Sequence, residues 1–242
     1  MAADLSLTTA DPADLADLAA VTADPARASR RGRRLAPLGP VAQLRAGRLP
    51  RRLVQLTVGL VLYGATLAMI IRSTLGNASW DVLHQGMAQR LPISIGTAVI
   101  VMSLVVLLLW IPLRERPGLG TIANSFVVGL VADATLRVLA TPDAVGLRVA
   151  LLVGGVVLNA VATAAYIGSQ LGPGPRDGLM TGLHRRTGLP VGVVRTGIEV
   201  TVVALGWLLG GVVGIGTVLY TLSIGPLVQL LLPMFVVELP DR

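Results

Sequence analysis

The residues most able to do chemistry in this sequence form a charged pair inside an apolar stretch. Arg195 and Glu199 are four residues apart within residues 191–209. At this spacing both side chains project from the same face of a helix and can pair with each other. A charge near the centre of a bilayer is costly unless it is paired or lines a cavity. Glu199 is therefore a candidate proton or cation site on a polar path, and the alternative is an ion pair that only satisfies itself.

Two aspartates fall in the longest connections of the chain, and both connections open with Gly or Pro residues. Because Asp is a favourable helix N-cap, Asp81–Arg90 and Asp177–Arg186 are each predicted to form a short helix that starts at its Asp. Such a helix can lie in the membrane interface. It can also enter the bilayer as a re-entrant half-helix whose N-terminus attracts an anion or a polar solute. The alternative is that both aspartates serve only as caps.

Further polar residues occur inside apolar stretches and extend the hypothetical path. Asp133 and Arg137 repeat the four-residue spacing, and we expect them to form an ion pair near the interface. Asn124 and Asn159 are uncharged groups at depth. The predicted substrate or ion path consists of Glu199, Arg195, Asp81, Asp177, Asn124 and Asn159.

Nothing in the sequence indicates an enzyme, a cofactor or a metal site. The chain has no Cys, which excludes disulfides and Cys-ligated metal centres. No Ser/His/Asp set, phosphate-cradling loop or nucleotide motif is recognisable. His84 and His184 fall in the two long connections, which we expect on opposite sides of the membrane, so the two histidines cannot share one metal ion.

Membrane-spanning helices are the elements that must position these residues. The chain is 53% hydrophobic and 14% charged, with a mean hydropathy of +0.75, whereas a soluble domain is about 25% charged. A hydrocarbon core of about 30 Å takes about 20 apolar residues as a helix. The candidate spans are Leu53–Ile71, Ile93–Pro112, Leu119–Ala140, Leu147–Ile167, Val191–Leu209 and Val212–Val237. We therefore predict an all-α polytopic protein of the lipid bilayer with six transmembrane helices.

The first part of the chain, residues 1–50, differs in composition from the rest. It is acidic at first and then rich in Arg, with few large apolar residues, so we predict a disordered cytoplasmic tail. With the tail inside, the inner segments hold 15 Arg and the outer segments hold 4. By the positive-inside rule, both termini are expected in the cytoplasm of a multi-pass protein of the inner (plasma) membrane. The net charge of +7 comes mostly from the Arg-rich run next to the first span, residues 27–52, so no nucleic-acid partner is expected.

The second half of the sequence repeats the first at an offset of 96 residues. The matching positions are Asp81 with Asp177, Arg90 with Arg186, Gly118–Thr121 with Gly214–Thr217 and, after a two-residue insertion, Pro92 with Pro190. We divide the membrane part into a first repeat, 51–140, and a second repeat, 141–242. Three spans per repeat are an odd number, so the second repeat enters the membrane from the opposite side. The prediction is two inverted three-helix repeats, each with a short interfacial or re-entrant helix after its first span.

Several motifs of the chain point to a known family. They are Trp80–Gly86, Pro112–Arg114, Pro117–Thr121, Gly174–Met180, Gly214–Thr217 and Gly225–Pro226. Together they resemble the bacterial YczE/YitT-like integral membrane proteins over about residues 50–235. The resemblance implies a membrane protein with a suspected transport role, and it assigns no chemistry to any residue.

Charge within the membrane and inverted symmetry favour a transporter or permease for an unknown small solute. One alternative is a channel-like pore formed by the two re-entrant segments. Another is a membrane scaffold or regulator without transport, left from an old duplication. The sequence leaves open the substrate, the coupling ion and whether copies of the chain form a homo-oligomer.

Overall fold

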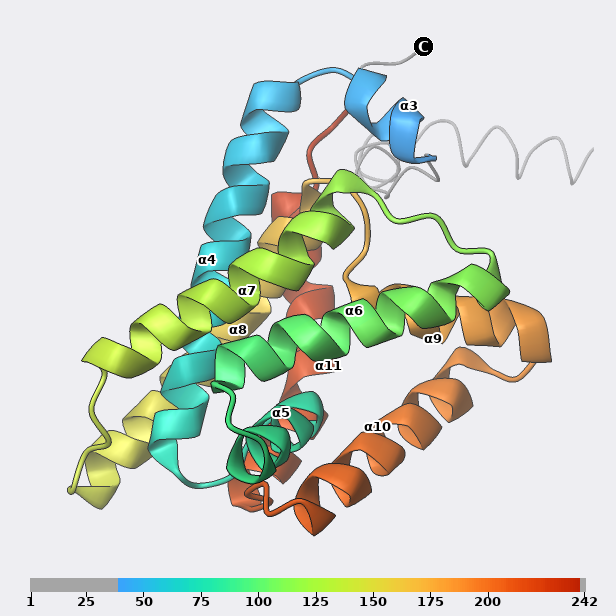
Figure 1. Ribbon diagram of the computed structural model, residues 1–242. Coiled ribbons are helices and arrows are strands. Elements are labelled where there is room, and N and C mark those ends of the chain that lie inside the picture. Colours follow the sequence, from blue (N-terminus) through green and yellow to red (C-terminus); the bar gives the residue numbers. More distant parts are fainter. Residues whose placement is uncertain (1–38, 240–242) are drawn as a thin grey trace, which may run out of the picture. The chain divides into compact units, whose positions relative to one another are not determined.

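Figure 1 shows the computed structural model, which describes residues 39–239. All regular structure in this range is helical. The helices are α3 (Pro40–Arg45), α4 (Leu49–Ser73), α5 (Ser79–Arg90), α6 (Ile95–Leu113), α7 (Leu119–Val138), α8 (Val145–Gly168), α9 (Pro175–Thr187), α10 (Val191–Leu208) and α11 (Ile215–Phe235). The six longest, α4, α6, α7, α8, α10 and α11, are long and apolar enough to cross a membrane.

The prediction of an all-helical protein with six candidate spans is confirmed over the described range. The predicted ends differ from the observed ones by no more than four residues, and the largest difference is the start of α4 at Leu49. Pro50 explains that start, because proline is favoured in the first turn of a helix. Residues 40–45 belong to the predicted disordered tail but form α3, while residues 1–38 of that tail lie outside the described residues.

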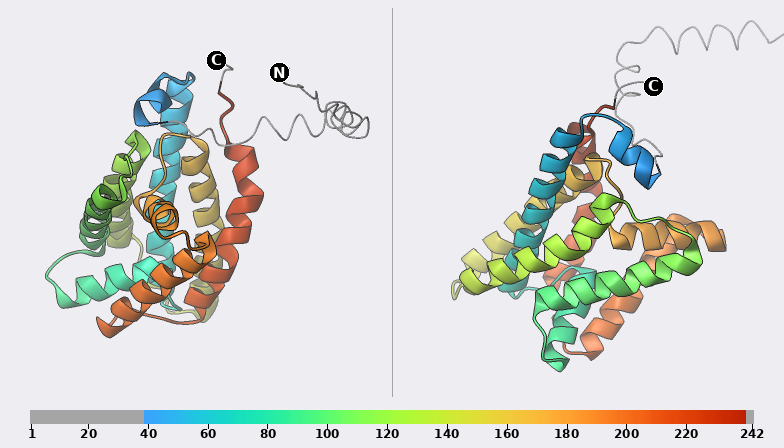
Figure 2. Two further views of the ribbon diagram at one scale, coloured as in Figure 1. Left: turned by 90° about the vertical axis from the view of Figure 1, so that its right-hand side faces the viewer. Right: turned by 45° about the horizontal axis from the view of Figure 1, so that its top comes forward.

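The first spans of the two repeats, α4 and α8, pack closely against each other. Gly59, early in α4, lies against Ala162 and Tyr166, late in α8, whereas Gly155, early in α8, lies against Ile70, late in α4. This pairing makes the two helices antiparallel, as Figure 1 also shows. Small residues let the backbones approach closely, which stabilises helix packing in a membrane. In the left view of Figure 2, α7 flanks α4 on one side and α11 flanks α8 on the other.

The connections that follow α4 and α8 are held in the same way in each half. The backbone N–H of Gly216 donates to the Leu75 carbonyl at 2.8 Å, and the N–H of Gly120 donates to the Leu171 carbonyl at 2.7 Å. The third span of each half therefore begins against the connection of the other half.

Glycine is required directly after these two leucines. Gly76 has φ +120° and Gly172 has φ +122°, a region that favours glycine. A Cβ at either position would also meet backbone atoms, those of Gly214 or of Gly118, at 3.0 Å or less. The two halves therefore share this turn as well as its sequence.

The second spans pack differently in the two halves. α6 lies along α7, whereas α10 makes no comparable contact with α11 within the described residues. Each short helix packs on the second span of the other half, α5 on α10 and α9 on α6. This difference leaves space between α10 and α11, and the candidate site lies there.

The expected ion pair between Asp133 and Arg137 is wrong. The Asp133 carboxylate instead accepts hydrogen bonds from the Ser94 hydroxyl and, at 2.8 Å, from the backbone N–H of Gly96. Asp133 therefore satisfies the start of α6, where backbone N–H groups lack partners within the helix.

Candidate functional site

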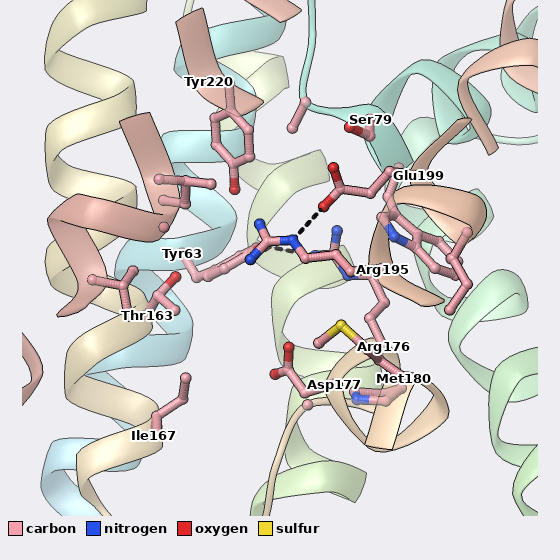
Figure 3. A pocket seen from close by; sticks show the side chains of 18 of the residues that line it. Tyr63, Ser79, Thr163, Ile167, Arg176, Asp177, Met180, Arg195, Glu199 and Tyr220 are labelled. Atoms are coloured by element: carbon pink, nitrogen blue, oxygen red, sulfur yellow. Dashed lines mark hydrogen bonds and ion pairs between the residues drawn. The ribbon is translucent and has the colours of Figure 1, made fainter. Parts of the chain in front are cut away.

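A cavity of about 290 Å³ lies among α4, α5, α7, α8, α9, α10 and α11. Its charged lining residues are Arg176, Asp177, Arg195 and Glu199. Figure 3 shows these four side chains pointing into the same space. Aromatic side chains from four helices complete the polar wall, namely Tyr63, Trp80, Tyr166 and Tyr220.

Both short helices begin at this cavity. Ala78 is the N-cap of α5 and Gly174 is the N-cap of α9, and in the described part of the chain no side chain caps either helix start. The prediction that Asp81 and Asp177 are N-caps is therefore wrong, because both are third residues of their helices. Pro175 explains the earlier start of α9, since proline is favoured in the first turn. Both uncapped starts line the cavity, where their free N–H groups give a positive potential.

The two equivalent aspartates have different surroundings. Asp81 is buried behind the cavity wall, and its carboxylate lies 3.1 Å from Nδ1 of the buried His84. Burial lowers the pKa of His84 below its ordinary value, although Asp81 opposes this shift, so the imidazole is neutral at pH 7. Asp177 faces the cavity and accepts a hydrogen bond of 2.8 Å from the Tyr166 hydroxyl. Only the aspartate of α9 is placed to meet a ligand.

Arg176 is held by aromatic side chains. Its guanidinium donates to the Tyr63 hydroxyl at 2.6 Å and lies 5.8 Å from the Tyr63 ring centre and 5.6 Å from that of Trp80. Burial disfavours its charge, but the electrostatic effects of Tyr63, Asp81, Tyr220 and Tyr166 together outweigh burial and raise the pKa of Arg176. The guanidinium therefore remains charged, and aromatic faces stabilise it there.

The pair predicted from sequence spacing is present on α10. Nε of Arg195 donates to Oε1 of Glu199 at 2.9 Å, and the side chains are 42% and 23% exposed. Both residues line the cavity. A role for Glu199 in proton or cation transfer stays a prediction.

The remaining path residues lie at different depths in the wall. Asn124 of α7 lines the cavity. Asn159 is buried behind it, where its amide donates to the Thr66 hydroxyl at 2.9 Å and accepts from the Tyr220 hydroxyl at 2.8 Å. Asn159 thus positions Tyr220, which itself lines the cavity.

Arg176 was not among the site residues predicted from the sequence. Its signal was its place beside Asp177 in the Gly174–Met180 motif, at the start of a helix that opens with Pro. The tyrosines gave no signal, because a single Tyr in an apolar span is ordinary.

Comparison with known proteins places the chain in a family. Residues 50–233 match the model of DUF6198, a family of unknown function. The chain belongs to this family. It is 41% identical over 181 residues to an uncharacterized protein of Haemophilus influenzae, an alignment that covers 73% of this chain and 83% of that protein. No solved structure gives a significant match.

Two relatives from Bacillus subtilis are more distant. The uncharacterized membrane protein YczE is 29% identical over 177 residues, which cover 72% of this chain and 82% of YczE. The uncharacterized protein YyaS is 25% identical over 184 residues, which cover 73% of this chain and 90% of YyaS. These matches confirm the resemblance to YczE. With six apolar helices, they support a multi-pass membrane location.

Proposed function

We propose that this protein is a transporter of a small solute in the plasma membrane, not an enzyme or a scaffold. The observation that carries the proposal is the charged cavity inside a bundle of apolar helices, with two uncapped helix starts in its wall. Charged residues at membrane depth mark pathways for substrates or ions. Broken helices that point their N-termini at a central site are typical of secondary transporters.

The proposal includes an inverted arrangement of the two halves. Its supports are the 96-residue offset, the antiparallel packing of α4 on α8 and the reciprocal bonds at Leu75 and Leu171. Inverted repeats give a transporter two related conformations, one open to each side of the membrane, because each half can adopt the helix packing of the other half. The looser packing of α10 on α11 than of α6 on α7 fits one of those conformations.

The position of the cavity fits a state open to the cytoplasm. Asn124 lies near the start of α7, Ile167 near the end of α8 and Gln229 in the second half of α11, and all three line the cavity. Under the orientation predicted from the arginine distribution, these positions lie on the cytoplasmic side of the bilayer centre.

Flux through the purified protein tests the proposal. Liposomes containing the protein would be loaded with a mixture of small metabolites, and mass spectrometry would identify the solutes that leave. Gly225→Phe should block this flux, because Gly225 lines the cavity. Gly192→Phe is the control, since Gly192 does not line the cavity and a Cβ there would meet no described residue within 4 Å.

The form of the flux separates the alternatives. A transporter gives flux that saturates with solute concentration, whereas flux that rises linearly would replace the proposal with a channel. A folded protein that moves no solute of the mixture, together with one stoichiometric protein partner in a pull-down, would replace it with a scaffold.

A further inference from the structure

Of the four charged side chains on the cavity wall, two form an ion pair with each other and two do not form an ion pair with any described residue. Arg195 and Glu199 neutralise each other through their ion pair. Arg176 and Asp177 have no ion-pair partner among the described residues. Although they are adjacent in sequence, neighbouring residues on a helix do not face each other. The wall thus presents one free cation and one free anion to whatever occupies the cavity.

Each of these two groups keeps unused bonding capacity. A guanidinium has five N–H donors, and within residues 39–239 Arg176 gives a hydrogen bond only to the Tyr63 hydroxyl. A carboxylate accepts through both oxygens, and Asp177 uses Oδ2 for the Tyr166 hydroxyl. Tyr63 and Tyr166 therefore orient the two charged groups without neutralising them.

The balance of charge in the wall selects the class of ligand. Two arginines and two carboxylates line the cavity, so a ligand of either sign alone would leave an uncompensated charge inside an apolar bundle. A ligand with a carboxylate and an ammonium group would satisfy both free groups. A planar guanidinium binds a carboxylate through two parallel hydrogen bonds, and the uncapped start of α5 also favours a negative group.

The size of the cavity limits the ligand further. At about 30 Å³ per water molecule, the cavity of about 290 Å³ holds about ten waters, which suits a solute of amino-acid size. We propose that the cavity binds a small zwitterion, with its carboxylate on Arg176 and its ammonium group on Asp177. This inference rests on the proposed transport function, because it names the substrate class of the same cavity.

Binding to the purified full-length protein in detergent tests the proposal with three small molecules that share one branched carbon. They are L-alanine, which has both charges, isobutyrate, which has only the carboxylate, and isopropylammonium, which has only the ammonium group. β-Alanine and γ-aminobutyrate test the spacing between the charges. Titration calorimetry should show that at least one amino acid binds about tenfold or more tighter than both single-charge analogues. Equal binding of a single-charge analogue, or no binding of any amino acid, overturns the proposal.

Variants at the two positions should change selectivity in opposite directions. Arg176→Gln should remove the preference of the cavity for a carboxylate, so isopropylammonium binds at least as well as L-alanine. Asp177→Asn should remove the preference for an ammonium group, so isobutyrate binds at least as well as L-alanine. A purely structural role would weaken all ligands together and leave their order unchanged, which contradicts the proposal. Arg148→Gln is the matched control, since Arg148 bonds to the Pro142 carbonyl and does not line the cavity.

If either variant fails to fold, Arg176→Lys and Asp177→Glu keep the charges and change only their reach. The lysine variant should still prefer L-alanine over isopropylammonium, and loss of that preference contradicts the proposal. The outcome also separates this inference from transport itself. Tight binding of amino acids without flux would reject transport and keep the zwitterion site. Saturable flux of solutes with a single charge, and of none with two, would keep transport and reject the zwitterion site.

Discussion

Replacing Arg52 should strongly destabilise the protein, because this side chain is fully buried and joins three segments. Its guanidinium donates to the carbonyl oxygens of Gln43 at 2.5 Å, Ser169 at 2.8 Å and Gln170 at 2.7 Å. The last two carbonyls follow the end of α8, where backbone carbonyls lack partners within the helix. The positive charge also favours this end of the helix dipole.

The size of the effect follows from the groups that lose a partner. Arg52→Met removes these three short hydrogen bonds, each worth about 1 kcal/mol or more, so the free energy of unfolding should fall by about 3 kcal/mol. For a protein of this size, that corresponds to a fall in the apparent melting temperature of about 6–12 °C. Arg52→Lys should have a melting temperature between those of the wild type and Arg52→Met, since an ammonium group keeps the charge but lacks the planar, forked donors of a guanidinium.

The repeat supplies a matched control at the equivalent position. Arg148, 96 residues later, is only half-buried and gives one hydrogen bond of 2.7 Å, to the Pro142 carbonyl. Arg148→Met should therefore lower the melting temperature by less than half as much as Arg52→Met. Scanning fluorimetry of both variants in one detergent measures the difference. Equal shifts, or no shift for Arg52→Met, would refute the reasoning that Arg52 holds the end of α8.

Three further predictions concern protonation, the ion pair and orientation. Because the pKa of His84 is lowered in the folded protein, the folded state binds fewer protons than the unfolded chain, and the melting temperature should fall as pH drops below about 6.5. His84→Gln should reduce this fall in melting temperature. A variant with the same pH profile as the wild type would contradict this prediction. Glu199→Gln should abolish proton-coupled flux and leave membrane insertion intact. If the variant instead loses stability, and replacing both Arg195 and Glu199 by apolar residues restores stability with full activity, Glu199 has no functional role. Reporter fusions at both termini should give cytoplasmic signals, and a periplasmic signal at either end would reject the orientation.

Features set by local sequence were predictable. A membrane span can be recognised from its length and hydropathy, so the six candidate helices were predicted with small errors at their ends. Arg195 and Glu199 also formed the expected pair, because a four-residue spacing fixes their geometry within one helix. The shared turns at Gly76 and Gly172 agree with the sequence repeat, since both glycines have the same unusual φ.

Features set by contacts between distant helices were not predictable. Asp133 was expected to pair with Arg137 on its own helix, yet its partners lie 37 to 39 residues earlier, at the start of α6. Arg176 contacts Tyr63 and Trp80, which approach it only when α4, α5 and α9 meet. Helix spacing predicts neighbours along one helix, whereas these contacts depend on how the helices pack.

The difference between the two halves leads to a final prediction about movement. In the first half, a Cβ on Gly129 would lie 2.7 Å from Ile100, so the second and third spans touch there. After the two-residue insertion, the equivalent residues are Gly225 and Ile198, which both line the cavity. Among the described residues, a Cβ on Gly225 would meet only Arg195, at 3.9 Å.

If the halves exchange their packing during transport, Ile198 should come to lie against Gly225 and close the cavity. The chain has no Cys, so Ile198→Cys and Gly225→Cys can be combined without other thiols. Because a disulfide needs Cα atoms within about 7 Å, an oxidant should cross-link the pair only in molecules that have closed. Cross-linking should stop flux, and a reductant should restore it, whereas the single variants should keep their flux under oxidant. A pair that never cross-links while flux continues would show that transport does not use this closure, and the exchange of packing between the halves would have to be abandoned.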